Sequence, residues 1–128
     1  MPKKEVITPA GMRPPFAPFS LCTRFGDLVY VAGQTAYNHD IGRAEGDIRQ
    51  QTRTVLQRVK HILEEAGSSM ENALSSSCYI DNLEDFPAFN EEYATHFPVP
   101  MPVRATTQVK LMSPGCLVEI FIVACIPD

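Results

Sequence analysis

The run from Leu117 to Cys125 constrains the fold more than any other part of the chain, because it alternates like a strand but is apolar on both faces. One face would carry Val118, Ile120, Ile122 and Ala124, and the other Leu117, Phe121, Val123 and Cys125. Both faces of such a strand need to be covered. Glu119 interrupts the run, and a charged residue is seldom placed inside a protein without a partner.

A helix is predicted from Asp47 to about residue 66. Its apolar or small positions recur with helical spacing and form one stripe: Ile48, Thr52, Val55, Leu56, Val59, Ile62, Leu63 and Ala66. Asp47 suits the N-cap position, and Gly67 supplies the left-handed exit. Four basic residues lie largely off the stripe: Arg49, Arg53, Arg58 and Lys60. We interpret these basic residues as a solvated face rather than as a binding patch.

The segment EDFPAFNEEYATHF predicts a second helix, which begins near Glu84 or Asp85 because Pro87 belongs in the first turn. Four aromatic residues fall on one face of this helix: Phe86, Phe89, Tyr93 and Phe97. We interpret this aromatic face as core packing rather than as a cofactor site.

Strands are predicted on both sides of these helices. In FSLCTRFGDLVYVAGQ, two β-prone runs flank Gly26-Asp27, which indicates a hairpin turn. Further strands are expected at 72–81, 104–111 and 117–125, the last two joined at Ser113-Pro114-Gly115. The predicted order is β-β-α-β-α-β-β, in a single domain that spans residues 1–128.

The number of helices has a consequence for assembly. Two helices cover only one face of such a sheet. A monomer would therefore leave one apolar face of the run 117–125 in water, so we expect other subunits to bury the second face of the sheet. The pattern alone predicts an oligomer.

Charge and composition exclude several classes of protein. The net charge is −4, the pI is about 5.3, and no basic stripe is visible, which argues against a nucleic-acid binder. No apolar run is long enough to span a bilayer. The start, MPKKEVITPAG, has no apolar stretch typical of a secretory signal, so the expected compartment is the cytoplasm.

No metal or redox motif is visible in the sequence. The cysteines form no C-x-x-C pair, and no histidine lies at metal spacing from any of them: Cys22, Cys78, Cys116 and Cys125. We expect four reduced thiols, mostly buried as small hydrophobic side chains. A metal site is not expected.

Arg104 and Glu119 are the candidate catalytic residues. An arginine at a strand start can bind a substrate carboxylate through two parallel hydrogen bonds. A glutamate held in an apolar wall can have a raised pKa and so handle a proton near neutral pH. Arg104 could instead lie on a polar surface of its strand, and Glu119 could be satisfied by a neighbouring backbone or lysine group; the pattern leaves both alternatives open.

The spacing of these two residues limits how they can work together. If the last two strands form a tight hairpin around Pro114, Glu119 lies opposite about Val109. Arg104 is then five positions further on, or about 16 Å away at roughly 3.3 Å per residue. Either the strands are not hairpin partners, or the site is shared between subunits.

Four segments together cover most of the chain: VYVAGQTA, GDIRQQTRTVLQRVKHILEEAGSSMENAL, YIDNLEDFPAFNEEYATHF and PVRATTQVKLMSPGCLVEIFIVA. In these segments the chain resembles the reactive intermediate deaminase family, also called RidA/YjgF, and the resemblance extends over nearly the whole chain. The opening, ITPAG followed by PPFAPFS, further resembles the aminoacrylate deaminase branch of pyrimidine degradation. The resemblance implies a chorismate-mutase-like α+β fold, with a mixed sheet, two helices on one face, and a homotrimer whose sites lie between subunits.

The resemblance also implies an activity and a set of residues. It implies cofactor-free hydrolysis of enamines and imines, such as 2-aminoacrylate and its imine tautomer, to a 2-keto acid and ammonia. Arg104 matches the residue that binds the substrate carboxylate, and Glu119 the one that positions or activates water. Gly33 matches a glycine whose backbone lies close to the ligand, and Asn90 an asparagine of the second helix.

Three positions depart from the usual pattern of this family. Phe19 stands where many members carry a tyrosine, Thr106 where many carry a cysteine, and Ala32 where a serine is common. These changes bear on substrate preference more than on the reaction. Thr106 can still donate from its backbone N–H and its hydroxyl.

The sequence leaves two alternatives to a deaminase. One is a non-catalytic trimer that binds a small carboxylate metabolite or a protein partner in its clefts. The other is the ribonuclease activity that has been linked to this family. The acidic balance and the lack of a surface that combines basic and aromatic residues make the ribonuclease a poor alternative.

Overall fold

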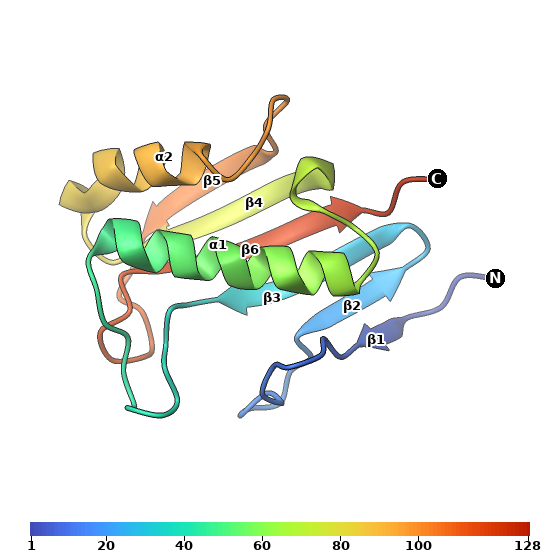
Figure 1. Ribbon diagram of the computed structural model, residues 1–128, viewed down its shortest axis with the longest axis horizontal. Coiled ribbons are helices and arrows are strands. Elements are labelled where there is room, and N and C mark those ends of the chain that lie inside the picture. The colour runs from blue at the N-terminus through green and yellow to red at the C-terminus, as the bar shows by residue number, and fades with distance from the viewer.

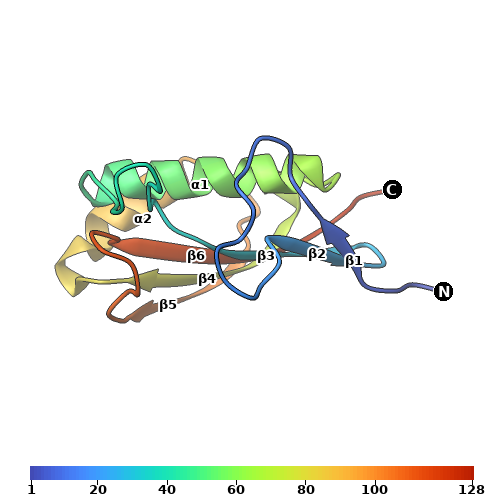
Figure 2. The same ribbon diagram turned by 90° about the horizontal axis from the view of Figure 1, so that it is seen from below.

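The computed structural model describes all 128 residues and contains one six-stranded sheet with two helices on one face (Figure 1). The strands are β1 (Glu5–Ile7), β2 (Cys22–Phe25), β3 (Leu28–Gln34), β4 (Ala73–Ile80), β5 (Val103–Gln108) and β6 (Val118–Cys125). The helices are α1 (Ile48–Glu65) and α2 (Phe86–Ala94), and short 3₁₀ turns lie at Met70–Asn72 and Leu83–Asp85. The α+β class and the placement of both helices on one face are confirmed (Figure 2).

The strands run in the order β1-β2-β3-β6-β4-β5, and only β4 and β5 are parallel neighbours. The doubly apolar strand β6 lies between β3 and β4 and is antiparallel to both. The helices cover one face of β6 (Figure 2), which explains why the residues on that face are apolar. The predicted turn at Gly26-Asp27 is confirmed, with Phe25 opposite Leu28.

The sheet answers one question that the sequence leaves open, and it contains one strand that the sequence did not predict. The last two strands are not hairpin partners, because β5 pairs with β4 at the edge of the sheet while β6 lies on the other side of β4. The strand β1 was not predicted; it pairs Glu5 with Arg24 and Ile7 with Cys22 at the opposite edge. Three residues with no clear alternation carry too weak a pattern to be recognised as a strand.

Helix α1 begins and ends where the sequence indicates. The backbone N–H of Gln50 donates to the carboxylate of Asp47 at 2.9 Å, and the Gln50 side chain accepts from the Asp47 backbone N–H at 2.9 Å, which forms a capping box. Gly67 follows the last turn with φ +88°, a conformation in which a side chain is disfavoured. Helix α2 begins at Phe86, preceded by a 3₁₀ turn, with Pro87 in its first turn as predicted.

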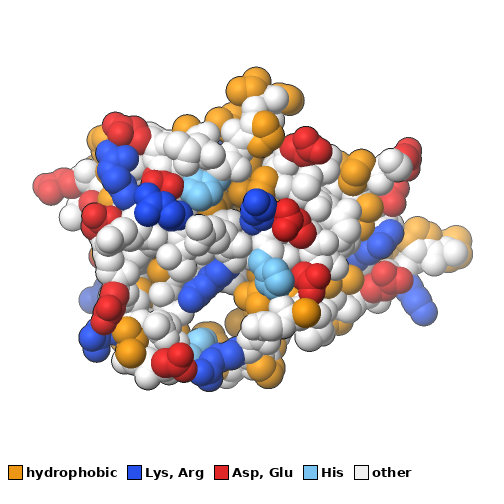
Figure 3. All heavy atoms as spheres, viewed as in Figure 1, with side chains coloured by type: hydrophobic (Ala, Val, Ile, Leu, Met, Phe, Trp, Pro, Cys, Tyr) orange, Lys and Arg blue, Asp and Glu red, His pale blue; other side chains and the backbone are white.

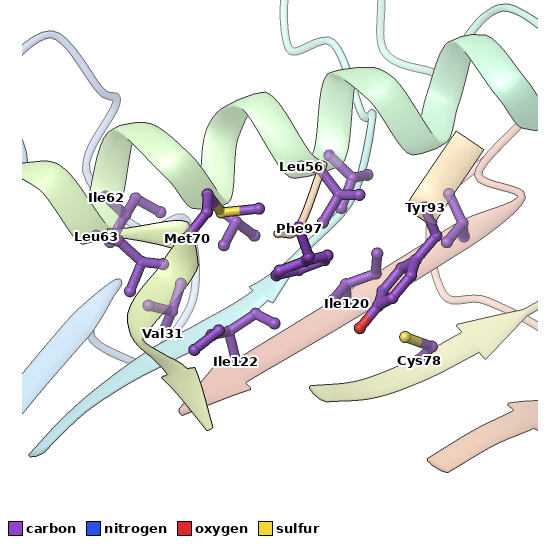
Figure 4. Packing of buried hydrophobic residues seen from close by; sticks show 14 of the residues in the cluster. Val31, Leu56, Ile62, Leu63, Met70, Cys78, Tyr93, Phe97, Ile120 and Ile122 are labelled. Carbon is purple, nitrogen blue, oxygen red and sulfur yellow. The ribbon is translucent and has the colours of Figure 1, made fainter. Parts of the chain in front are cut away.

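The core lies between the helices and the sheet. The alternate residues Val118, Ile120, Ile122 and Ala124 of β6 are fully buried beneath the helices. Figure 4 shows Leu56 and Leu63 of α1 above Val31, Ile120 and Ile122 of the sheet. The aromatic residues of the second helical segment belong to this core, because Phe89, Tyr93 and Phe97 are buried and their rings contact one another.

The second face of the sheet has no helix over it (Figure 2). Glu119 and its neighbours on this face, Leu117, Phe121, Val123 and Cys125, are only partly buried. Large apolar side chains are exposed here, including Tyr30 at 40% and Val103 at 70%. An apolar face of this extent is typical of a surface that contacts another chain.

Candidate active site

An open cavity of about 960 Å³ lies beyond the end of β3. Its walls come from five parts of the chain: the N-terminal loop between residues 11 and 21, residues 32–40, Arg58 and His61 of α1, residues 111–113, and Glu119 and Phe121 of β6. Figure 3 shows a hollow bordered by basic and histidine side chains on the helix-covered side of the molecule. The ion pair between Arg13 and Asp40, at 2.6 Å, joins the N-terminal loop to the segment after β3.

Glu119 lies in the wall of this cavity and has no partner in the chain. Its carboxylate accepts no hydrogen bond, and no Lys, Arg or His nitrogen lies within 4 Å of it. Partial burial raises the pKa of Glu119 above the usual value for a glutamate. An unpaired carboxylate with a raised pKa is suited to accept a proton from a small molecule in the cavity.

The glycine at position 33 makes room for that carboxylate. A Cβ atom built on Gly33 would lie 2.7 Å from Oε2 of Glu119, which is closer than real Cβ contacts. Gly33 is an exposed residue of the cavity wall, so its backbone is accessible there. Phe19 and Ala32 line the same cavity, with Phe19 42% exposed.

A buried glutamine fixes the start of the strand that carries Glu119. The Nε2 atom of Gln51, a residue of α1 that is 1% exposed, donates to the carbonyl oxygens of Gly46 at 3.1 Å and Gly115 at 2.9 Å. Its Oε1 accepts from the Leu117 backbone N–H at 2.8 Å. Because the Gln51 side chain is buried, breaking these three bonds would leave its amide without partners, so this side chain holds the start of β6 in place.

Arg104 lies at a different place, on the edge strand β5 beneath α2. Its Nη2 donates to Oδ1 of Asn90 at 2.8 Å. Its guanidinium also lies over the rings of Tyr93, Phe89 and Phe86, at 4.8, 5.4 and 5.7 Å from their centroids. No carboxylate lies within 4 Å of Arg104, so helix α2 orients the side chain without neutralising its charge.

Thr106 accompanies Arg104 on the same face of β5. The parallel register pairs Arg104 with Ser76 and Thr106 with Cys78. The hydroxyl of Thr106 is buried without a hydrogen-bond partner, and so is the hydroxyl of Tyr93. Figure 4 shows the Tyr93 hydroxyl pointing towards Cys78.

The predicted site residues therefore fall into two groups in one chain. Glu119, Gly33 and Phe19 line the cavity, whereas Arg104, with Asn90 and Thr106 beside it, does not. Arg104 is in register with Ser76 and Glu119 with Tyr79, and residues 76 and 79 are an odd number of positions apart on β4. Arg104 thus projects from the helix-covered face of the sheet, and Glu119 from the open face.

Two residues of this region were not predicted as part of it. Arg58 was assigned to a solvated face, and this was wrong: it is only partly exposed and its Nη1 donates to the carbonyl oxygens of Thr35 and Tyr37. The helical pattern could not show that the segment after β3 passes over this side chain. Gln51 was not singled out either, although a glutamine beside an apolar stripe was the available signal.

Two other kinds of reactive group are candidate metal ligands and cysteine thiols. No cluster of three or more His, Cys, Asp or Glu side chains could hold a metal ion. All four cysteines are free thiols, and Cys22, Cys78 and Cys116 are buried, as predicted. Burial raises the pKa of Cys22 to about 11 and also raises the pKa of Cys116, so these thiols stay protonated at neutral pH. No helix is long and apolar enough to cross a membrane.

Comparison with known proteins places the chain among its relatives. A family model described as Endoribonuclease L-PSP matches residues 11–126. The chain belongs to the Endoribonuclease L-PSP family. Within this family it is 40% identical to the 3-aminoacrylate deaminase RutC of Acinetobacter baylyi, in a match that covers 94% of this chain and 97% of the relative. The resemblance to RidA-type proteins, and to the aminoacrylate deaminase branch, is confirmed.

Solved structures of the Endoribonuclease L-PSP family have the same fold. The Rid-family protein YyfA from Yersinia pestis is 31% identical with a TM-score of 0.88, over 97% of this chain and 100% of that one. RidA from an Antarctic Psychrobacter species is 25% identical with a TM-score of 0.86, over 95% of this chain and 99% of that one. The cavity, the α2 side chains that contact Arg104, and the open sheet face therefore belong to a fold that other Rid proteins share.

Proposed function

We propose that the protein is a cofactor-free hydrolase of reactive enamines and imines of the 2-aminoacrylate and 2-iminopropionate type, and that it acts as a homotrimer. The observation that carries this proposal is the unpaired carboxylate of Glu119 in a cavity wall, with a raised pKa. The 40% identity to a 3-aminoacrylate deaminase supports the same reaction class.

In the proposed reaction, water adds to the C=N carbon of the imine tautomer. Glu119 accepts a proton from that water as the C–O bond forms, and the imine nitrogen takes up a proton from solvent, which gives a neutral carbinolamine. Glu119 then returns its proton to the amino nitrogen, the C–N bond breaks with its electron pair on nitrogen, and the hydroxyl releases its proton to solvent as the C=O bond forms. The products are a 2-keto acid and ammonia, so atoms and charge balance without an oxidant, a metal or an organic cofactor.

Arg104 is assigned to the substrate carboxylate. Its guanidinium has no carboxylate within 4 Å, and Asn90 and three aromatic rings hold it in place. A planar cation held in this way can bind a carboxylate through two parallel hydrogen bonds. The Thr106 hydroxyl, which is buried without a partner, is a candidate donor or acceptor next to it.

The proposed cleft lies between two subunits. Arg104 and Glu119 of one chain project from opposite faces of the sheet, so one small substrate needs Arg104 from one subunit and Glu119 from the next. The exposed apolar residues on the open face, such as Tyr30 and Val103, support burial of this face against another chain. In such a cleft Gly33 would offer its backbone to the substrate, and Phe19 would form an apolar wall.

The test is a direct measurement of imine hydrolysis. An amino-acid oxidase or a lyase generates the imine, semicarbazide traps the fraction that survives, and keto acid release is compared with and without the protein. Wild type should accelerate release. Arg104→Ala should lower kcat/KM at least ~100-fold, since it loses two charged hydrogen bonds, and Arg104→Lys should recover little because an ammonium lacks the two-pronged geometry.

The alternative functions have distinct outcomes in the same experiment. A trimer that binds carboxylates without turnover would leave the imine decay unchanged while still binding a 2-keto acid. A ribonuclease would cleave RNA in an Arg104-dependent manner and leave imines alone. The net charge of −4 is against the ribonuclease.

A further inference from the structure

The cavity that contains Glu119 also contains a cation for which the proposed reaction has no use. Arg58 projects from α1 into this cavity and is only partly exposed. One nitrogen, Nη1, donates to the carbonyl oxygens of Thr35 and Tyr37. Nε and Nη2 make no hydrogen bond within the chain, so two of the three guanidinium nitrogens have no protein partner.

No acidic side chain neutralises Arg58. The cavity is lined by two carboxylates, of which Asp40 is paired with Arg13 at 2.6 Å and Glu119 lies more than 4 Å from every basic nitrogen. Burial lowers the pKa of Arg58 below its usual value, although an arginine remains charged at neutral pH. A partly buried cation without a counter-charge is stabilised when an anion binds beside it.

The cavity also extends well beyond Glu119. Its volume in one chain is about 960 Å³, part of which a neighbouring subunit would fill in the proposed cleft. The walls reach from Glu119 and Phe121 of β6 to Arg58 and His61 of α1. A substrate held at Glu119 thus has room for a side chain that extends towards the helix.

We propose that Arg58 binds a second carboxylate, carried at the end of the substrate side chain, so that the preferred substrates are 2-imino dicarboxylic acids. The proposal rests on the proposed function, in which Arg104 of a neighbouring subunit binds the first carboxylate. Arg58 and Arg104 then hold the two ends of the substrate, and the imine carbon lies between them at Glu119. A monocarboxylic imine leaves Arg58 without a counter-ion.

A purely structural role for Arg58 makes a different prediction. Its bonds to the carbonyl oxygens of Thr35 and Tyr37 anchor the segment after β3. If anchoring were its only task, removing it would weaken all ligands of the cavity equally. If it binds a carboxylate, removing it weakens dicarboxylates more than monocarboxylates.

The first test measures binding of the product-like acids 2-oxoglutarate and 2-oxobutyrate by titration calorimetry. Wild type should bind the dicarboxylate at least ~10-fold more tightly. Arg58→Gln, which removes the charge but keeps a polar amide, should lose about 10- to 100-fold more affinity for 2-oxoglutarate than for 2-oxobutyrate, the usual effect of losing a charged hydrogen bond. Arg58→Lys keeps the charge and should retain part of the preference.

The matched control is Arg49→Gln, which removes the same charge from the same helix. Arg49 pairs with the exposed Glu91 and does not line the cavity, so the ratio of the two affinities should stay at its wild-type value. Equal affinities for both acids in wild type, or equal losses for both in Arg58→Gln, would overturn the proposal. The ratio of the affinities of wild type for 2-oxoglutarate and 2-oxobutyrate tests the proposal even if a variant does not fold.

The second test compares turnover of imines made by an oxidase from glutamate and from 2-aminobutyrate. We expect a higher kcat/KM for the glutamate-derived imine, and we expect this preference to be lost in Arg58→Gln. Turnover of both imines without any preference would reject the role of Arg58 and leave the deaminase standing. Absence of turnover, together with Arg58-dependent binding of 2-oxoglutarate, would reject the deaminase and leave the dicarboxylate site standing.

Discussion

Arg104 and Glu119 project from opposite faces of the same sheet, although both are near strand β4. Arg104 is in register with the buried Ser76, and Glu119 with the partly exposed Tyr79. Alternation along β4 sends these two positions to opposite sides. If both groups act on one small molecule, as we propose, each site takes Arg104 from one chain and Glu119 from another.

Mixing two inactive variants tests the shared site. Arg104→Ala and Glu119→Gln subunits, exchanged in equal amounts, should regain activity because a cleft is intact when it takes Arg104 from one variant and Glu119 from the other. With random assembly this is true of about one quarter of the clefts, so about one quarter of wild-type activity is expected. Keto acid release after verified subunit exchange is the measurement.

The double variant is the control for that experiment. Subunits that carry both substitutions, mixed with wild type, should dilute activity without creating new intact clefts. If the mixture of single variants, with exchange verified by mass spectrometry, stays as inactive as its parents, each site takes both residues from one chain, and the arrangement proposed here fails.

The pH dependence of the rate follows from the environment of Glu119. Burial raises the pKa of this carboxylate, and only the carboxylate form accepts a proton from water. As the pH falls, kcat/KM should therefore drop at a higher pH than the usual glutamate value of about 4.3 would give. Profiles of kcat/KM between pH 4 and 8, corrected for spontaneous hydrolysis, should show this step in wild type, while the residual rate of Glu119→Gln should lack it.

The same carboxylate should reduce the stability of the fold at neutral pH. A raised pKa in the folded state means that the charged form is disfavoured by folding, so stability falls as the pH rises from the unfolded pKa through the folded one. Glu119→Gln should raise the urea midpoint at pH 7. The gain should vanish near pH 4 and below, where the carboxyl group is protonated in both states. A gain of equal size at both pH values would contradict this explanation.

Gly33→Ala should impair the chemistry more than the fold. The new Cβ would lie 2.7 Å from Oε2 of Glu119, so the carboxylate at the end of a flexible side chain has to move. Displacing a positioned base costs about 10²–10⁴-fold in rate. Steady-state kinetics with urea unfolding checks this, and a rate within threefold of wild type would show that Glu119 tolerates the shift.

Local patterns predicted the elements of this fold well. The stripe of α1 and its caps at Asp47 and Gly67 depend on neighbours a few residues away, so the sequence displays them directly. Strand pairing depends on residues far apart along the chain. The hairpin considered around Pro114 is absent because β6 inserts between β3 and β4, an arrangement that no local pattern shows.

The sequence indicated which residues of the candidate site could carry the chemistry, but it did not show how they are arranged. The unusual charges Arg104 and Glu119 were visible in the sequence, and their placement on opposite faces required the register of β4 with both neighbours. Arg58 could not be recognised, because its surroundings are created by the segment after β3, which is remote in sequence. The surroundings of such a residue can be recognised only in the folded structure, because a loop that is remote in sequence creates them.

The last prediction concerns the contact that holds α2, and thereby Arg104, against α1. Glu92 of α2 binds Arg53 of α1 at 2.9 Å and His96 at 2.8 Å, with its side chain only 11% exposed. Although burial raises the pKa of Glu92, the hydrogen bonds from Arg53 and His96 outweigh that effect and hold the pKa below its usual value. Glu92→Gln should therefore destabilise the fold at pH 7, by about 1–3 kcal/mol for a lost charged hydrogen bond.

The sign of its pH dependence separates Glu92 from Glu119. A lowered pKa in the folded state adds stability above the unfolded pKa, and that stability is lost as the pH falls through the folded value. The deficit of Glu92→Gln should thus be largest near neutral pH and shrink below about pH 4, whereas Glu119→Gln shows a gain that shrinks over the same range. Because α2 also carries Asn90 and the aromatic rings that contact Arg104, Glu92→Gln should raise KM for the imine more than it lowers kcat. An unchanged KM in a destabilised variant would show that the position of Arg104 against α2 does not depend on the Glu92 contact.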